Sequence, residues 1–253
     1  MARCKVGVQL QPQHTTMDEL RTAWRTADAM GVDSIWTWDH FYPLYGEPDG
    51  PHFEGWMTLA AMAADTTNAS VGMLVTGNTY RNPELLADMA RTLDHISGGR
   101  AYLGLGAGWF ERDYDEYGYD FGTAGSRLRE MEASLGRIKA RTAKLHPAPV
   151  GELPILIGGG GEKVTLRITA TYADAWNTFG PPENFAHKNA VLDQWCAEIG
   201  RDPSEIERTV AIQGSEIDQV DAFLEAGATH LILMKGAEGA FAFDDLEQLL
   251  ARR

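Results

Sequence analysis

The sequence predicts an eight-stranded (β/α)8 barrel. Short apolar segments alternate with longer stretches of helical periodicity along the whole chain, and we count eight of each. Several short segments are nearly continuous apolar runs, which is typical of parallel strands covered on both faces. The chain has 253 residues, a usual length for one such barrel, and no linker divides it. We therefore expect one domain over residues 1–253; an open doubly wound sheet is the alternative.

The strand predictions rest on apolar composition and on spacing. In chain order they cover residues 5–9, 34–37, 70–75, 101–105, 155–157, 175–177, 209–213 and 229–234. Repeated strand–helix–strand units indicate parallel pairing through right-handed crossovers. Eight such units in a chain of this length favour closure into a barrel.

Helix ends carry local signals. Thr16, followed three residues later by Glu19, predicts a capping box before the first helix. Asp202-Pro203-Ser204-Glu205 offers an N-cap, a proline at the first helical position and a glutamate at the third. Glycines stand where left-handed helix C-caps are expected, at Gly31, Gly98, Gly99, Gly200 and Gly227.

Charge and cysteine content exclude several classes of partner. The net charge of −14 argues against nucleic acids and anionic membranes, which clustered Lys and Arg would bind. Cys4 and Cys196 form no disulfide framework or zinc-ligand pattern. No apolar run approaches the ~18 residues of a spanning helix, and polar residues interrupt the first segment where a signal peptide would be apolar. We expect a cytoplasmic protein with a small-molecule substrate.

Catalytic groups in such barrels come from loops that follow the carboxyl ends of strands. The longest of these loops are residues 38–54 and 106–125. His40, in the first loop, is the group best suited to proton exchange near neutral pH, and a structural role within the loop is the alternative. Asp39 is expected to point elsewhere and contact a ligand, because neighbouring strand residues face opposite ways. Aromatic residues of this region that would line a pocket for a flat ring, or pack in the core, are Trp36, Trp38, Phe41, Tyr42, Tyr45, Phe53 and Trp56.

The second loop contains glycines and an acidic cluster. Gly104, Gly106 and Gly108 do not match the dinucleotide fingerprint, and we expect no helix to open after them. Instead, Gly106 and Gly108 would let the backbone pass beneath a bound ring. The acidic cluster consists of Glu111, Asp113, Asp115 and Glu116. Most of it is expected to form a solvated face, and Glu111 is the second catalytic candidate.

A glycine quartet, Gly158, Gly159, Gly160 and Gly161, precedes Lys163 and a predicted helix. Consecutive bare N–H groups at a helix start are typical of an anion site, so the sequence predicts a phosphate cradle here. Hydrolase and metalloenzyme motifs are absent from the sequence, and the spacing of His40, His52 and Glu54 is irregular for metal ligands. We predict no metal site.

Segments distributed over nearly the whole chain together resemble one family. They are Val6-Gly7-Val8-Gln9, Trp38-Asp39-His40-Phe41, Leu74-Val75-Thr76-Gly77, Tyr80-Arg81-Asn82-Pro83, Ser97-Gly98-Gly99-Arg100, Leu103-Gly104-Leu105-Gly106-Ala107-Gly108-Trp109, Ile157-Gly158-Gly159-Gly160-Gly161 and Tyr172-Ala173-Asp174-Ala175-Trp176-Asn177. In this order they are similar to the luciferase-like flavin and deazaflavin oxidoreductases, in particular the branch that uses coenzyme F420.

The resemblance implies a (β/α)8 barrel with a deazaflavin or flavin at its mouth, and a homodimer. Asp39 and His40 would flank the reactive edge of the ring, and Leu74, Val75 and Thr76 would support one ring face. A non-proline cis peptide is expected between Met73 and Val75. The glycine quartet would hold the cofactor phosphate, with Trp176 and Asn177 ending a strand beside it.

Two departures from the family pattern affect the pocket. Phe110 stands where many relatives have asparagine, which removes one polar contact to the cofactor. Residues 145–154 are shorter than the family's usual insertion, which helps to roof the pocket, so we expect an open pocket.

The expected activity is hydride transfer between C5 of F420 and a small organic substrate, with His40 or Glu111 moving a proton. An FMN-dependent monooxygenase and a non-catalytic flavin- or deazaflavin-binding barrel are the alternatives.

Overall fold

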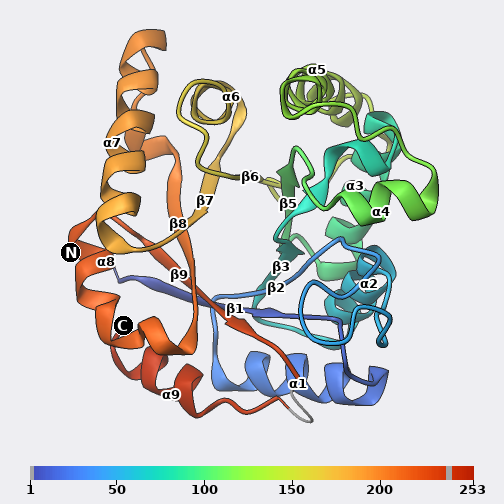
Figure 1. Cartoon of the computed structure of the whole chain (residues 1–253), viewed down its shortest axis with the longest axis vertical. Coiled ribbons are helices and arrows are strands. Elements are labelled where there is room, and N and C mark those ends of the chain that lie inside the picture. The colour runs from blue at the N-terminus through green and yellow to red at the C-terminus, as the bar shows by residue number, and fades with distance from the viewer. Residues whose placement is uncertain (1–2, 238–240) are drawn as a thin grey trace.

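A closed parallel sheet forms the centre of the structure, a computed structural model that describes residues 3–237 and 241–253. Among these residues the strand order is β3-β2-β1-β9-β8-β7-β6-β5-β4, and a further pairing of β3 with β5 closes the ring. Because β3 and β4 are two parts of one barrel strand, the barrel has eight strands (Figure 1). The predicted (β/α)8 fold is confirmed.

The strands lie close to their predicted positions. They are β1 (Lys5–Leu10), β2 (Ser34–Thr37), β3 (Ser70–Met73), β4 (Thr76–Gly77), β5 (Ala101–Gly106), β6 (Ile155–Gly158), β7 (Ala175–Phe179), β8 (Glu207–Ile212) and β9 (His230–Lys235). Side chains inside the barrel form one small cluster of Trp36, Leu74, Leu156, Ala175, Ala211 and Ile232. The larger apolar core lies between the sheet and the helices.

Helices surround the sheet in Figure 1. They are α1 (Met17–Met30), α2 (Gly55–Asp65), α3 (Pro83–Ser97), α4 (Glu111–Tyr117), α5 (Ala124–Thr142), α6 (Thr165–Tyr172), α7 (Pro182–Ile199), α8 (Val220–Glu225) and α9 (Asp244–Ala251). None of the helices in the described residues is long and apolar enough to cross a membrane.

Most of the helix ends lie where the capping residues predicted them. Thr16 and Glu19 form the expected capping box at α1, and all five glycines predicted as C-caps have positive φ. Asp202 caps only a single 3-10 turn, Pro203–Glu205, rather than a full helix. The reason is that α7 already supplies the helix of this unit, and β8 begins at Glu207.

The third barrel strand is interrupted, so the predicted strand over residues 70–75 was too long. It ends at Met73, and pairing resumes at Thr76. The peptide between Leu74 and Val75 is cis, within the interval that the family resemblance indicated. The amide of Gln9 donates a 2.8 Å hydrogen bond to the Leu74 carbonyl and holds this break from β1, although β2 lies between β1 and β3 in the sheet.

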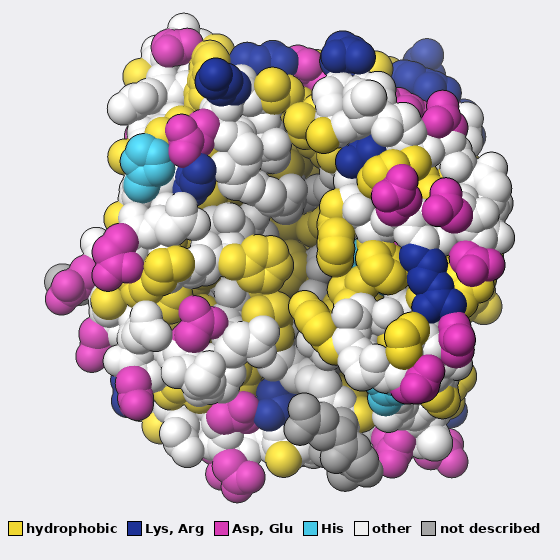
Figure 2. Space-filling model, in the orientation of Figure 1, with side chains coloured by type: hydrophobic (Ala, Val, Ile, Leu, Met, Phe, Trp, Pro, Cys, Tyr) yellow, Lys and Arg dark blue, Asp and Glu magenta, His cyan; other side chains and the backbone are white. Residues whose placement is uncertain are grey.

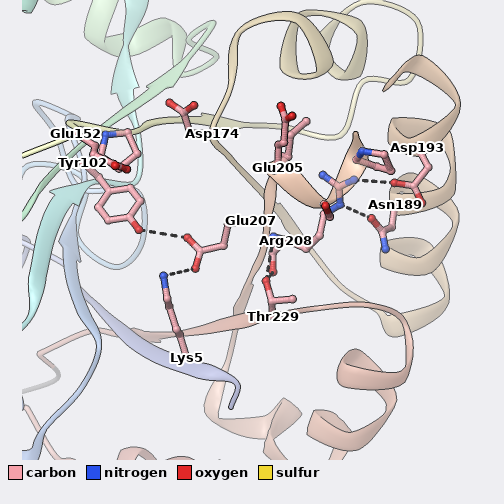
Figure 3. A pocket seen from close by; sticks show the side chains of 14 residues that line it. Lys5, Tyr102, Glu152, Asp174, Asn189, Asp193, Glu205, Glu207, Arg208 and Thr229 are labelled. Carbon is pink, nitrogen blue, oxygen red and sulfur yellow. Dashed lines mark hydrogen bonds and ion pairs between the residues drawn. The ribbon is translucent and has the colours of Figure 1, made fainter. Parts of the chain in front are cut away.

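The amino ends of the strands carry a charged cavity of about 780 Å³ (Figure 3). Lys5 lies 2.7 Å from Glu207, which also accepts a 3.3 Å hydrogen bond from Tyr102. Arg208 lies 2.7 Å from Asp193. These groups pair with one another across strand starts, on the face that serves stability in such barrels.

We expect Gly104→Ala to destabilise the fold by about 3 kcal/mol, because an added methyl has no room beside the interrupted strand. A Cβ on Gly104 would lie 1.8 Å from the Met73 carbonyl oxygen. The control is Gly136→Ala in α5. A Cβ added there would meet no atom within 4 Å outside the backbone of its own helix, so this variant should stabilise the fold by about 0.5–1 kcal/mol. Urea unfolding of both variants measures the difference; similar midpoints would contradict this prediction.

Candidate active site

The opposite end of the barrel contains a cavity of about 560 Å³ at the carboxyl ends of the strands. Its lining residues are Gln9, Trp38, Asp39, His40, Leu44, Tyr45, Leu74, Val75, Thr76, Gly77, Tyr80, Gly106, Ala107, Gly108, Trp109, Gly158, Gly159, Thr165, Asn177, Phe179, Gln213 and Met234. The face drawn in Figure 2 is hollowed at its centre, with hydrophobic side chains on both sides of the hollow. Although the charged cavity is larger, this one contains the predicted proton-transfer group at the face where barrel enzymes react.

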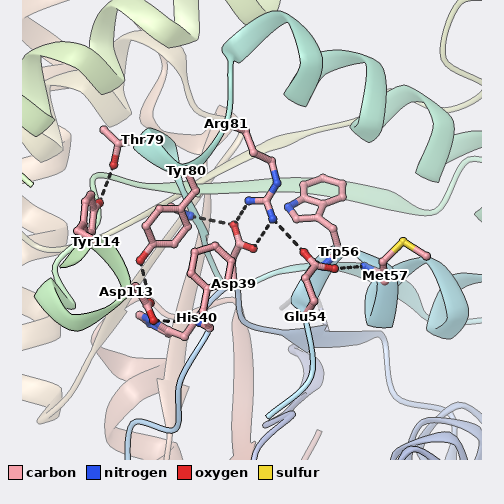
Figure 4. A network of polar contacts seen from close by, with 12 residues as sticks. Asp39, His40, Glu54, Trp56, Met57, Thr79, Tyr80, Arg81, Asp113 and Tyr114 are labelled. Carbon is pink, nitrogen blue, oxygen red and sulfur yellow. Dashed lines mark hydrogen bonds and ion pairs between the residues drawn. The ribbon is translucent and has the colours of Figure 1, made fainter. Parts of the chain in front are cut away.

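His40 is oriented by a buried carboxylate. Its Nδ1 lies 2.8 Å from Asp113 Oδ2, and Asp113 also accepts hydrogen bonds from the Phe41 N–H, at 3.0 Å, and the Tyr80 hydroxyl, at 2.9 Å (Figure 4). Because a carboxylate accepts, Nδ1 carries the hydrogen, and Nε2 of the neutral ring is an acceptor. No hydrogen bond to Nε2 occurs within the described residues. The arrangement leaves Nε2 able to take up or return a proton.

Asp113 is an exception to the expected solvated face, and the prediction that no helix follows Gly108 was wrong. Residues 111–117 form the short helix α4, which turns Asp113 and Tyr114 inward and leaves Glu111 exposed. Glu111 does not line the cavity, and the carboxylate that bonds to His40 is that of Asp113. The aromatic residues Phe110, Tyr114 and Tyr117, spaced by four and three, were the sequence signal for this helix.

Asp39 and His40 have different partners, as expected for neighbouring residues whose side chains face opposite ways. Arg81 Nη2 lies 2.9 Å from Asp39 Oδ1, and the same guanidinium lies 3.0 Å from Glu54 (Figure 4). Burial raises the pKa of Asp39 to about 6, although Arg81 opposes this shift. No local sequence pattern predicted a role for Arg81, which lies 42 positions from Asp39.

Leu74, Val75 and Thr76 form an apolar part of the cavity wall next to the glycines that end β5 and β6. A Cβ added to Gly106 would lie 2.6 Å from the Val75 side chain, and one added to Gly158 would lie 3.0 Å from it. On Gly108 a Cβ would lie 1.9 Å from the Tyr114 hydroxyl. Gly106 and Gly108 therefore make room for protein side chains, and both also line the cavity, so their role beneath a bound ring stays a prediction.

One buried polar atom in this wall has no partner. Among the described residues, the Thr76 hydroxyl oxygen makes no hydrogen bond. Because buried hydroxyl groups are normally satisfied, Thr76 is a candidate contact for a polar atom of a ligand.

The glycine quartet lies between β6 and α6, as predicted. Gly158 and Gly159 line the cavity, but Gly160 and Gly161 lie beyond it. The Gly159 N–H donates to the Asn177 carbonyl at 2.9 Å, so this donor is already used. Within the described residues, the N–H groups of Gly160 and Gly161 have no hydrogen-bond partner.

Trp176 and Asn177 support this loop from β7. Trp176 is fully buried, does not line the cavity, and donates from Nε1 to the Gly159 carbonyl at 2.9 Å. Asn177 does line the cavity, and its amide donates to Thr209 at 2.8 Å.

Residues 145–154 do not border the mouth. The N–H groups of Val150 and Gly151 donate to Asp94 at 2.7 and 2.8 Å, and the segment leads into the amino end of β6. Its length therefore has no direct effect on the cavity, contrary to the expectation from the family pattern. Phe110 packs edge-on against His40, with ring centroids 5.5 Å apart.

Within residues 3–237 and 241–253, no group of three or more His, Cys, Asp and Glu side chains is placed to hold a metal ion. His52 has another role, because its Nε2 accepts a 2.9 Å hydrogen bond from Trp38 Nε1. Burial lowers the pKa of His52 to about 4.

The sequence matches the family model of luciferase-like monooxygenases over residues 1–215. The chain belongs to this family. One curated relative is a phthiodiolone/phenolphthiodiolone dimycocerosates ketoreductase from Mycobacterium tuberculosis, 27% identical over 246 residues. The match covers 81% of this chain and 64% of the relative.

Solved structures share the fold at low identity. An F420-dependent secondary alcohol dehydrogenase in complex with an F420-acetone adduct has a TM-score of 0.85, 18% identity and 96% coverage of both chains. The coenzyme F420-dependent tetrahydromethanopterin reductase from Methanopyrus kandleri has a TM-score of 0.76 and 15% identity, over 98% of this chain and 96% of that one. A 3,6-diketocamphane monooxygenase from Pseudomonas putida, in complex with FMN, has a TM-score of 0.68 and 17% identity. The match covers 83% of this chain and 67% of that one.

We expect Asp39 to take up a proton with a pKa of about 6 in the folded protein. The ordinary aspartate pKa is about 3.9. The folded state therefore binds this proton more tightly than the unfolded chain. The proton bound to Asp39 stabilises the folded state fully below about pH 4, and this stabilisation is lost as the pH rises through about 6.

Infrared difference spectra should show a protonated-carboxyl band growing as the pH falls from about 7.5 to about 5. The band should be absent in Asp39→Asn and retained in Asp218→Asn, which changes an exposed carboxylate. A band that persists unchanged in Asp39→Asn would contradict the assignment.

Proposed function

We propose that this protein is an F420-dependent oxidoreductase that transfers a hydride between the deazaflavin C5 and a carbon atom of a small alcohol or carbonyl compound. The observation that carries the proposal is the Asp113–His40 pair, because His40 lines a cavity with an apolar wall and Asp113 bonds to its Nδ1, not to its Nε2. The F420-dependent solved structures named above support the choice of cofactor.

The residues present fit a flat ring with a phosphate-bearing tail. Leu74 and Val75 offer an apolar surface for a ring, and the unpartnered Thr76 hydroxyl offers a contact to a polar ring atom. The bare N–H groups of Gly160 and Gly161, beside the start of α6, would hold a phosphate. When bound, F420 supplies two-electron hydride chemistry.

His40 and Asp113 account for the proton. With a hydride acceptor bound in the cavity, His40 Nε2 would take the proton from the hydroxyl oxygen of an alcohol as it is oxidised to the carbonyl compound. Asp113 holds the ring and stabilises the imidazolium that forms. In the reductive direction, protonated His40 would return the proton to the carbonyl oxygen.

An FMN-dependent monooxygenase is the second candidate, because the family name and the FMN-bound structure favour it. Titrating the purified protein with F420 and with FMN, followed by fluorescence, separates the two. Tighter binding of F420, and its reduction by an alcohol on the enzyme, would support our proposal. Preference for FMN would overturn it, and F420 binding without turnover of any alcohol would favour a non-catalytic binding barrel.

His40→Ala should lower turnover by ~10²–10⁴-fold, because the group that moves the proton is lost. The F420 dissociation constant should change by less than about threefold. His95→Ala is the matched control, because His95 forms a hydrogen bond with the Ala148 carbonyl, 53 positions away, and does not line the cavity. Steady-state kinetics and cofactor titration measure both effects, and an unaltered rate would remove His40 from the mechanism.

Gly159→Asp should bind F420 at least about tenfold more weakly than Gly159→Ala, because a carboxylate would repel the phosphate. Both variants experience the same backbone strain, since Gly159 has a φ of 127°. The comparison therefore isolates charge. Fluorescence titration of the two variants gives the ratio, and equal affinities would argue against a phosphate at this loop.

A further inference from the structure

Aromatic side chains surround the ring of His40. The centroid distances from His40 are 5.8 Å to Trp38, 5.6 Å to Trp109 and 5.5 Å to Phe110. Trp38 and Trp109 line the same cavity as His40. A substrate whose oxygen reaches Nε2 must therefore lie among these apolar surfaces.

Exposed aromatic residues continue this surface to the outside. Trp109, Tyr45 and Phe179 all line the cavity, yet they are 64%, 60% and 59% exposed. They come from three separate segments, which follow β5, follow β2 and end β7. Large exposed aromatic side chains that converge on one cavity mark a binding surface for an apolar group.

The cavity provides little charge to compensate an ionic substrate. Among the described residues, no lysine or arginine lines it, and Asp39 and His40 are its acidic and imidazole members. Asp39 is already paired with Arg81, and His40 with Asp113. An anionic group placed here, away from the glycine loop, would lose its hydration without gaining a counter-charge.

We infer that the substrate is an uncharged alcohol or ketone with an apolar chain or ring of several carbons, which extends from His40 along Trp109 toward Tyr45 and Phe179. This inference rests on the proposed function and specifies its substrate class. The oxygen end binds at His40 Nε2, and the apolar end lies against the exposed aromatic residues.

The test uses the enzyme loaded with oxidised F420, which does not react with ketones. Calorimetric dissociation constants are measured for 2-butanone, 2-hexanone, 2-octanone and 7-oxooctanoate. Affinity should rise by up to about fourfold for each added methylene, because each one is removed from water. The 7-oxooctanoate ion has the chain length of 2-octanone but ends in a carboxylate, and it should bind at least about tenfold more weakly.

Trp109→Ala and Phe179→Ala should reduce the advantage of 2-octanone over 2-butanone, while Ile199→Ala should keep it. Ile199 is an exposed apolar residue of α7 that does not line the cavity. The F420 dissociation constant of each variant is measured separately by fluorescence and should stay within about threefold.

The possible failures are distinguishable. If F420 binds but affinity is independent of chain length, or 7-oxooctanoate binds as tightly as 2-octanone, the inference is overturned and the proposed function stands. If F420 does not bind, the proposed function fails, and the inference fails with it.

Discussion

Asp113 is the carboxylate on which the mouth of the barrel depends. It is completely buried, and an unpaired carboxylate in this position would cost several kcal/mol. Its three donors come from two segments: His40 and Phe41 follow β2, and Tyr80 follows β4. Because all three must converge on one group, the same contact that satisfies the charge also fixes the imidazole ring above the cavity.

The charged groups near the cavity are arranged so that its interior stays almost neutral. Asp39 faces Arg81, which also binds Glu54 and does not itself line the cavity. The Arg81 guanidinium therefore lies behind the wall, and the lining itself combines apolar and aromatic side chains with His40, Asp39 and uncharged polar residues such as Asn177. This lining would suit the proposed hydride transfer, which requires close contact between carbon atoms and exclusion of water.

Local patterns predicted most of the fold, and long-range pairs account for what they missed. Eight apolar segments, the Thr16 capping box and the glycine loop before α6 can each be recognised within a few residues. The cavity-lining positions of His40, Val75 and Asn177 follow from the rule that strand ends carry the site. The partner of His40 lies 73 positions away, and no short pattern indicates that Asp113 turns inward. Glu111 was preferred because sequence reasoning treated an amphipathic turn as a solvated loop.

The two ends of the barrel rely on different interactions: one end joins the strands to one another, and the other carries the candidate site. Contacts among Lys5, Tyr102 and Glu207 join strand starts at the face remote from the cavity, and Arg208 joins β8 to α7 there through Asp193. Loops at the mouth contribute none of these contacts. New specificities can therefore arise by exchanging residues around Tyr45, Trp109 or Phe179 while the scaffold beneath is preserved, which makes this chain a suitable starting point for directed evolution of its substrate range.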